Sequence, residues 1–343
     1  MKKKFRKTLI LTAKLLVAAA LLVLVMRKVH WGDYPGPDGQ DRQGFATTIT
    51  QADPYLLTVA TVCFLLPLFI LAFRWWYLLR LQKIEISLRE VARLTFLGTF
   101  FNYVVPGSVS GDLVKAYYAA KHTDRKVAVL VSVFIDRALG LLEFVLLPAV
   151  VIAVMYSVGA DGTDRLTIPA VIVACVLAVT VATLAMLLSG RLRRFLRLGK
   201  IISRLPMQKY ITLAGEAVGL YGRRPIVLTK AVGITFVGQT VFIIGIMLSA
   251  WSLGMDIAWY KFFVYIPIIY IIASVPISPG GLGLVEFFYL TFFAVAAVSE
   301  SEVLALALTA RLIPMLCSLP GLVVALTGPK LPPAEQIRAE LTD

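Results

Sequence analysis

The chain has 343 residues, of which 59% are apolar and 16% charged, and its formal net charge is +14. A soluble protein has about a quarter of its residues charged and could not hide this much apolar side chain from water. The composition therefore excludes a soluble nucleic-acid-binding protein, the class that a strongly basic chain first suggests. It indicates an integral membrane protein.

The chain begins with a basic segment followed by an apolar one. Five Lys and Arg residues precede residue 8, and an apolar run covers residues 8–26. A secretory signal peptide has a similar order, but its apolar core of about 7–15 residues ends at small residues before a polar chain. Here Ala18 to Ala20 are followed by more apolar residues. We therefore expect an uncleaved first helix.

Six apolar runs are long enough to cross about 30 Å of hydrocarbon at roughly 1.5 Å per residue. They are residues 8–26, 54–79, 127–158, 167–189, 231–250 and 303–327. If the N-terminus lies in the cytoplasm, 25 of the 34 Lys and Arg residues fall on the cytoplasmic side, five on the outer side and four within the runs. This is the positive-inside pattern, so we expect both termini in the cytoplasm.

The polar segments predict connections and no separate soluble module. The outer loop 27–53 is rich in Gly and Pro, so its aspartates are expected in turns. The basic stretch 191–225 interleaves Arg and Lys with Leu and Ile, which is typical of amphipathic helices on an anionic membrane surface. Residues 328–343 are expected to form a cytoplasmic tail.

Residues 1–327 form one predicted membrane domain, and each of its halves, 8–158 and 167–327, holds an interrupted apolar segment. The segment 87–120 is broken by Pro, Gly and Ser, and the segment 262–298 by Pro and several Gly. Irregular backbone at membrane depth is stable only where it packs in protein or lines a wet cavity. Paired interruptions are typical of inverted-repeat transporters. We predict an all-α protein of six to eight crossings with two re-entrant or broken-helix hairpins, although an ordinary loop at the second break would give eight full crossings.

The third run carries three ionisable residues at mid-depth, Asp136, Arg137 and Glu143. Asp136 and Glu143 are seven positions apart, so they share one face of a helix. Buried charges cost several kcal/mol unless they are paired or hydrated. Two interpretations stay open for Asp136 and Arg137. They lock the bundle by pairing with other helices, for example with Arg311 and Glu286, or they line a polar pathway.

The first break has the composition of an anion-binding helix start. Gly107 and Gly111 permit close approach, and Ser108 with backbone N–H groups can face an anion at the positive end of the following helix. Asp112 is expected to cap that helix. Lys115, one turn further on, either contacts a phosphate or extends to the membrane surface.

The second break offers similar glycines, and one further arginine lies near a membrane surface. Gly280, Gly281 and Gly283 precede a short helix that contains Glu286. Arg74 stands beside two tryptophans near the cytoplasmic end of the second run, so we expect it to anchor the helix at the interface.

The ordered motifs carry a family resemblance. They are Asn102-x-x-x-Pro106-Gly-x-x-x-Gly111-Asp112-x-x-Lys115, Asp136-Arg137-x-x-Gly140-Leu, Pro276-x-x-Pro279-Gly-Gly-x-Gly283-x-x-Glu286, and Arg311. Over roughly residues 10–327 the chain resembles the lysylphosphatidylglycerol synthase transmembrane family, a flippase-like region of bacterial multiple peptide resistance factors and of many stand-alone proteins. The resemblance implies a multi-spanning bundle that moves lipids between leaflets. Family members often have Gly at 110 and Arg near 108 and 115, so the headgroup preference is not carried over.

These features predict a lipid translocase of the bacterial cytoplasmic membrane. An anionic or zwitterionic headgroup, or a lipid-linked sugar, would enter a cavity between the two interrupted segments. The candidate pathway residues are Asn102, Gly107, Ser108, Gly111, Asp112, Lys115, Asp136, Arg137, Glu143, Pro279, Gly280, Gly281, Gly283, Glu286 and Arg311. We expect no metal, no cofactor and no nucleic-acid partner, because the sequence has none of their spacings.

The alternative is an enzyme. Bifunctional relatives carry an aminoacyl-transferase domain after the membrane region, whereas 16 residues follow residue 327 here, so we expect no lysyl transfer by this chain. A membrane-embedded glycosyl- or phospho-transferase with a polyprenyl-linked donor would need a catalytic carboxylate in the outer loop. The clustered options are Asp33, Asp38 and Asp41.

Overall fold

The computed structural model describes most of the predicted membrane domain. The described residues are 12, 16, 19–35, 41–104, 110–159, 166–188, 219–275, 277–294 and 298–327. Most of the predicted amphipathic connector and the whole tail lie outside them, as do Gly107 and Ser108 of the first break. Of the first predicted run, the described residues 19–26 are helical.

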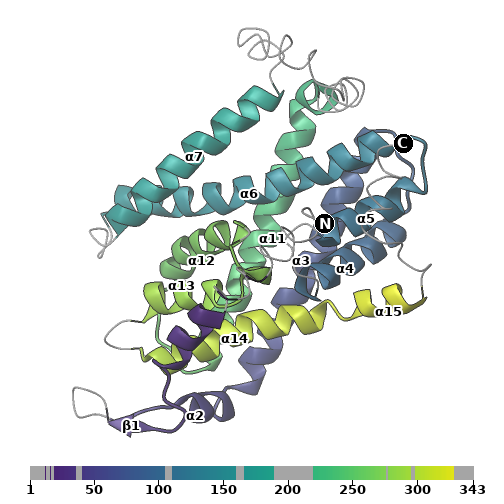
Figure 1. The fold of residues 1–343 in the computed structure, drawn as a ribbon. Coiled ribbons are helices and arrows are strands. Elements are labelled where there is room, and N and C mark those ends of the chain that lie inside the picture. Colours follow the sequence, from purple (N-terminus) through teal and green to yellow (C-terminus); the bar gives the residue numbers. More distant parts are fainter. Residues whose placement is uncertain are drawn as a thin grey trace. The chain divides into compact units, whose positions relative to one another are not determined.

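The chain folds into helices, which confirms the all-α prediction (Figure 1). They are α2 (Phe45–Thr50), α3 (Pro54–Leu81), α4 (Leu88–Val104), α5 (Ser110–Ala120), α6 (Lys126–Ser157), α7 (Thr167–Leu188), α11 (Pro225–Ser252), α12 (Trp259–Ser274), α13 (Leu284–Phe293), α14 (Glu300–Cys317) and α15 (Pro320–Thr327). A 3-10 turn, η2 (Pro279–Gly281), precedes α13. Two short strands, β1 (Tyr34–Pro35) and β2 (Asp41–Arg42), pair antiparallel.

Within the described residues, four helical stretches are long and apolar enough to cross a membrane. They are Pro54–Leu81, Lys126–Ser157, Pro225–Ser252 and Glu300–Thr327, the last made of α14 and α15. They coincide with four of the predicted runs, and shorter apolar helices follow at α7, α12 and α13. The helices therefore fit a multi-pass membrane protein, while the number of crossings and their orientation remain predictions.

The first interrupted segment is a pair of neighbouring helices, α4 and α5 (Figure 1). A Cβ atom added at Gly98 of α4 would lie 2.9 Å from the carbonyl oxygen of Gly111 and 3.4 Å from Cβ of Lys115. The backbones of the two helices therefore touch. The 11 residues of α5 rise about 16 Å, half of the hydrocarbon thickness, so α5 is too short to cross alone.

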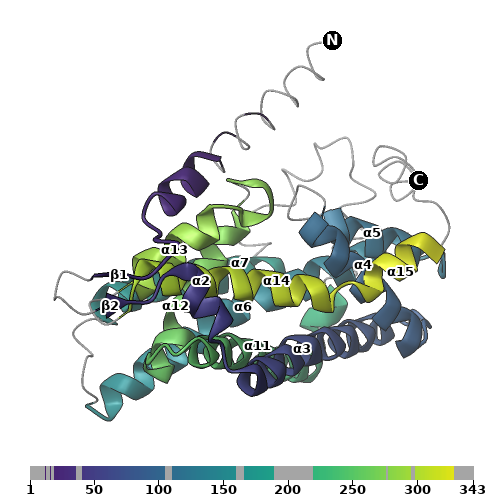
Figure 2. The ribbon, with the colours of Figure 1, turned by 90° about the horizontal axis from the view of Figure 1, so that it is seen from below.

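The second interrupted segment also consists of two helices side by side, α12 and α13 (Figures 1 and 2). The ring of Tyr265 stacks on Phe292 with 5.2 Å between centroids, and Phe262 packs on Phe293 at 5.3 Å. The ten residues of α13 rise about 15 Å. This length favours the hairpin hypothesis over a full crossing by α13.

The chain packs into two compact units, which are described separately. Unit 1 holds the described residues of Met1–Leu66, Asn102–Ser110 and Thr240–Cys317, and unit 2 those of Pro67–Phe101, Gly111–Gln239 and Ser318–Asp343. Each unit takes segments from both halves of the sequence, so the units are not the predicted sequence halves. The inverted repeat stays a prediction.

The core of unit 2 fixes the position of α5. On α4, Val91, Leu94 and Leu97 recur every three residues and therefore lie on one face, where all three are buried. They join Val114 on α5 and Trp75 on α3 in one apolar cluster. Between membrane helices such contacts stabilise mainly through close van der Waals packing, so the cluster holds α5 against α3 and α4.

The loop 27–53 of unit 1 is held by polar contacts. The Gly44 N–H donates to Oδ1 of Asp33 at 2.8 Å, which lowers the pKa of that carboxyl, and Asp33 directly precedes β1. Lys28 pairs with Glu300 at 3.0 Å, and the His30 N–H donates to the Ser301 hydroxyl at 3.0 Å. The loop is therefore attached to the start of α14.

Candidate functional site

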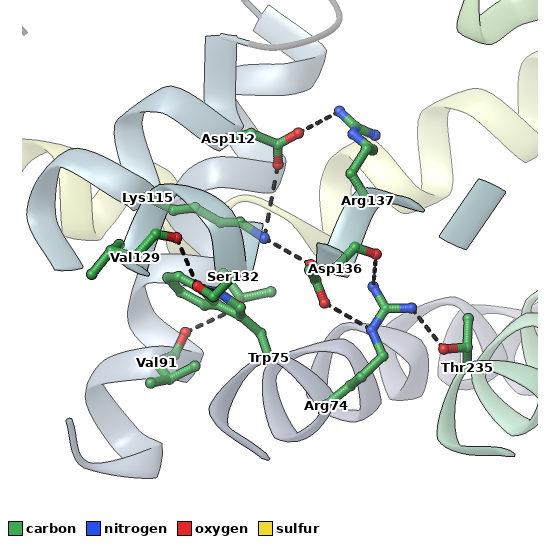
Figure 3. Close-up of polar contacts among 11 residues, drawn as sticks. Arg74, Trp75, Val91, Asp112, Lys115, Val129, Ser132, Asp136, Arg137 and Thr235 are labelled. Atoms are coloured by element: carbon green, nitrogen blue, oxygen red, sulfur yellow. Dashed lines mark hydrogen bonds and ion pairs between the residues drawn. The ribbon is translucent and has the colours of Figure 1, made fainter. Parts of the chain in front are cut away.

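Five charged side chains gather within unit 2 on α3, α5 and α6 (Figure 3). They are Arg74, Asp112, Lys115, Asp136 and Arg137, and we call them the five-charge cluster. Three are cations and two are carboxylates, so the cluster carries one surplus positive charge. It contains both residues of the predicted Asp-Arg motif and two residues that follow the first break.

Arg74 is the most deeply buried member, with 3% of its side chain exposed. Its Nε donates to Oδ1 of Asp136 at 2.8 Å, and a terminal nitrogen donates to the carbonyl oxygen of Asp136 at 2.9 Å. The other terminal nitrogen donates to the Thr235 hydroxyl on α11 at 2.8 Å. The predicted role of Arg74 as an interface anchor is therefore wrong. Because a carboxylate on α6 lies within its reach, the guanidinium is neutralised inside unit 2.

Lys115 is held from three directions. Its Nζ lies 3.0 Å from Oδ2 of Asp136 and 3.8 Å from Oδ1 of Asp112, and 4.6 Å from the ring centroid of Trp75. Only 9% of the side chain is exposed. Sequence reasoning left a phosphate contact and a surface-seeking lysine open for Lys115. The ion pairs show that its ammonium group lies inside the cluster, because the two carboxylate oxygens of Asp136 pair with Lys115 and Arg74. A phosphate contact by Lys115 stays a prediction.

Asp112 pairs with Arg137 across α5 and α6. The distance from Oδ2 of Asp112 to a terminal nitrogen of Arg137 is 2.6 Å. Asp112 is the third residue of α5, so it lies inside the helix and the predicted capping position is wrong. Its carboxylate still faces the positive end of the helix. Arg137 has 48% of its side chain exposed, which makes it the open side of the cluster.

The same helix offers space beside Arg137. Gly140 lies three positions further along α6, so the two share a face. Among the described residues, no atom lies within 4 Å of a Cβ atom added at Gly140. A bound group at Arg137 would therefore have room along α6.

Glu143 is buried beyond Asp136 on the predicted common face. The residue is 0% exposed, and neither carboxylate oxygen has a hydrogen-bond partner among the described residues. The positive charge of Arg74 acts on it electrostatically. An ionised carboxylate in such a place is costly, so Glu143 is best accommodated in its protonated form.

A second cluster lies in unit 1 and consists of Arg311, Glu286, Gly280 and Gly281; we call it the Arg311 cluster. Nε of Arg311 donates to Oε1 of Glu286 at 2.6 Å, and its terminal nitrogens donate to the carbonyl oxygens of Gly280 and Gly281, both at 3.1 Å. Gly280, Gly281 and Gly283 have φ of +58°, +69° and +75°, a region that disfavours side chains. Arg311 therefore holds the backbone of the second break.

The ion pairs differ from the pairing that the sequence suggested, in which Asp136 and Arg137 contact Arg311 and Glu286. Glu286 pairs with Arg311, whereas Asp136 pairs with Arg74 and Lys115. Arg137 pairs with Asp112. The ion pairs found within each unit therefore differ from the pairs that the sequence suggested.

The remaining candidates lie at the breaks. Asn102 is in the last turn of α4, Gly111 is in the first turn of α5, and Pro279 begins η2. Among the residues that the structure describes, no three His, Cys, Asp or Glu side chains gather as a metal ion would require.

Sequence reasoning missed Arg74 as a member of the site. The position of Arg74 in its helix could have shown this, because Arg74 lies seven residues before the end of α3. Seven residues span about 10 Å of helix, which is far for a side chain that must reach the surface. A buried partner on another helix was therefore to be expected, although its identity depends on how the helices pack.

Comparison with known proteins agrees with the motif pattern. The family described as the lysylphosphatidylglycerol synthase TM region matches residues 11–321. The chain belongs to this family. A UPF0104 membrane protein of Methanothermobacter thermautotrophicus is 24% identical over 281 residues, which cover 77% of this chain and 82% of the relative. The predicted family is thus confirmed, and the chain is a multi-pass membrane protein of the lysylphosphatidylglycerol synthase TM family.

Proposed function

We propose that this protein is a lipid translocase of the cytoplasmic membrane and that the five-charge cluster binds the headgroup phosphate. The observation that carries the proposal is the surplus positive charge of a buried cluster whose open side is the half-exposed Arg137. The family description supports a lipid substrate, since lysylphosphatidylglycerol synthase is named for a phospholipid.

The chemistry of the cluster fits a phosphate. A guanidinium presents parallel N–H groups that match two phosphate oxygens, and such charge-assisted hydrogen bonds are about twice as strong as neutral ones. A phosphate diester carries one negative charge, which equals the surplus of the cluster. The space beside Gly140 would take the part of the headgroup beyond the phosphate.

The other candidate residues have supporting roles in this proposal. Arg311 keeps the backbone of the second break in shape, because its donors are directed to Glu286 and to two glycine carbonyls. Glu143 and Glu286 balance charge or exchange protons during transport. Protonation would allow each carboxyl to stay buried when a neighbouring cation turns to the headgroup.

Transport is tested by reconstitution into liposomes that contain fluorescent phospholipids, with a membrane-impermeant quencher to report the outer leaflet. The wild-type protein is expected to equilibrate lipid between leaflets faster than empty vesicles. Arg137→Gln is expected to reduce the rate at least about tenfold, the factor that corresponds to losing 1.4 kcal/mol of binding.

Arg93→Gln is the matched control. Arg93 is similarly exposed, at 53%, and also pairs with a carboxylate, Glu90, but lies outside the cluster. It should keep the wild-type rate. Movement equal to that in empty vesicles for phosphatidylglycerol, phosphatidylethanolamine, phosphatidylcholine and a polyprenyl-linked sugar would contradict the proposal.

A further inference from the structure

We propose that Asp112 is an internal competitor for the headgroup phosphate: it occupies Arg137 in the unloaded protein and shifts to Lys115 when a phosphate binds. The inference rests on the proposed function and adds a residue that sets how tightly the anionic group is held. It predicts that removing this carboxylate strengthens binding, the reverse of the usual result for a residue in a binding site.

The geometry points to exchange because the carboxylate bridges two cations unequally. Oδ2 of Asp112 lies 2.6 Å from Arg137, while Oδ1 lies 3.8 Å from Nζ of Lys115 (Figure 3). The contact with Arg137 is at hydrogen-bond distance, whereas the contact with Lys115 is a long ion pair without a hydrogen bond. A side-chain rotation that shortens the second distance by about 1 Å would give Lys115 a normal charge-assisted hydrogen bond while it releases Arg137.

The exposure of the three side chains gives the exchange a direction. Lys115 is 9% exposed, Asp112 14% and Arg137 48%. A headgroup can therefore reach Arg137 from the open side, whereas Lys115 stays covered. Asp112 would move inward toward the covered cation, which leaves the open guanidinium to the incoming phosphate.

The displaced carboxylate would not be left unpaired. Lys115 keeps its contact with Asp136 at 3.0 Å and has further N–H groups to donate. Asp112 also remains in the first turn of the 11-residue helix α5, where the helix dipole favours a negative charge in either position. The displacement therefore weakens phosphate binding moderately and does not prevent it.

The other carboxylate of the cluster is unsuited to this role. Oδ1 of Asp136 accepts from Arg74 at 2.8 Å, and Oδ2 accepts from Lys115 at 3.0 Å. Both oxygens are engaged by buried cations, so a shift of Asp136 would leave one of these cations without its partner. The assignment of competition to Asp112 alone is therefore specific.

A competitor of this kind suits a transport site. A site that conducts must bind its cargo well enough to load it and weakly enough to release it. When the phosphate leaves, Asp112 returns to Arg137 and restores their ion pair of 2.6 Å. The carboxylate thus takes the place of the phosphate during the unloaded part of the cycle.

The experiment measures equilibrium binding of short-chain phosphatidylglycerol to the full chain in detergent. Asp112→Asn is expected to bind about tenfold more tightly than the wild type, the factor equal to 1.4 kcal/mol. Asp112→Ser removes the charge with a side chain favoured near helix starts and should give the same gain, so a folding defect of one variant leaves the other informative. The double variant with Arg137→Gln should lose the gain.

The control is Glu90→Gln. Glu90 is also a first-turn carboxylate, on α4, and pairs with an arginine at 2.8 Å outside the cluster. It should bind phosphatidylglycerol as the wild type does. Parallel titrations with inorganic phosphate separate a general anion site from a lipid site, and a gain for inorganic phosphate without a gain for phosphatidylglycerol would overturn the assignment to a headgroup.

Unchanged or weaker phosphatidylglycerol binding by both Asp112 variants, at wild-type thermal stability, overturns the inference. A gain that persists in the double variant with Arg137→Gln overturns it as well. These binding results are distinct from the transport assay. Failure of the wild-type protein to move lipid would refute the translocase, while a binding gain in Asp112→Asn would still establish the competition.

Discussion

The five-charge cluster and the Arg311 cluster each place arginine among apolar helices but use it differently. Arg311 directs its donors to one carboxylate and two backbone carbonyls, and its charge is balanced by Glu286. In the five-charge cluster, side chains mostly contact side chains, the charges do not cancel, and Arg137 is half-exposed. The comparison teaches that a charged residue in a membrane helix becomes a binding candidate through surplus charge and exposure, and not through depth alone.

The largest expected loss of stability comes from a substitution that breaks the buried ion pairs of the five-charge cluster. Asp136→Asn removes the carboxylate that neutralises both Arg74 and Lys115, which are 3% and 9% exposed. Breaking a buried pair by removing one partner costs about 3–5 kcal/mol. We expect a strong loss of thermal stability in detergent and a lower protein level. Wild-type stability of this variant would show that the cluster tolerates unpaired cations and would remove the structural role given to Asp136.

The next effect concerns the Arg311 cluster. Arg311→Gln leaves Glu286, which is 1% exposed, without its partner and two glycine carbonyls without donors. This variant removes one cation that neutralises one carboxylate, whereas Asp136 neutralises two cations, so we expect a smaller loss of about 2–3 kcal/mol. Thermal unfolding followed by size-exclusion chromatography measures it. The double variant Glu286→Gln with Arg311→Gln should recover part of the loss, and no recovery would mean that the backbone contacts dominate.

A third comparison sets two glycines of unit 2 against each other. Gly98→Ala forces a Cβ atom against the Gly111 carbonyl oxygen, a contact of 2.9 Å, and should cost about 1–3 kcal/mol as overpacking. Gly140→Ala places the same atom in open space and should leave stability nearly unchanged. Melting temperatures of the two variants measured side by side check the difference. Equal losses would contradict the space assigned to the Arg137 side of α6.

The smallest expected effect is in the loop 27–53 of unit 1. The Gly44 N–H lowers the pKa of Asp33, so this contact stabilises the loop above the ordinary pKa of the carboxyl and is lost as the pH falls through the lowered value. We expect cleavage of the loop by an acid-active protease to increase below about pH 3, since an unperturbed Asp titrates near 3.9. The ratio of the wild-type rate to the Asp33→Asn rate cancels the pH dependence of the protease itself, and this ratio should rise below that pH. A wild-type loop insensitive to pH would contradict the contact.

The helices of this protein could be predicted well because their signal is local. The lengths of the apolar runs located α3, α6 and α7 to within two residues. The predicted run 303–327 nevertheless divides into α14 and α15. Pro320 begins α15, where its missing N–H is harmless, but the same residue interrupts the hydrogen bonding of a continuous helix.

The site could be predicted only in part. Sequence reasoning singled out Asp136 and Arg137 because charge is rare in apolar runs, and Lys115 because it lies one turn past the first break. It did not give their partners, since pairing depends on which helix faces which at a given depth. The tryptophans beside Arg74 suggested a membrane interface, whereas Trp75 is buried and its indole N–H donates to Ser132. The local sequence pattern therefore identified the charged residues, and only the packing of the helices showed which partner each one has.

The contact between Gly98 and Gly111 restricts how this molecule can move. Sliding α5 along α4 by one residue, about 1.5 Å, would bring a side chain against a carbonyl where only hydrogen fits. Close-packed backbones of this kind permit discrete rearrangements and resist gradual sliding. We therefore expect α4 and α5 to move together as one rigid body. Asp112 and Lys115, both on α5, would then keep their relative positions. If the protein translocates lipid as proposed, a conformational change that exposes the headgroup to the other leaflet would have to bend the chain outside this contact.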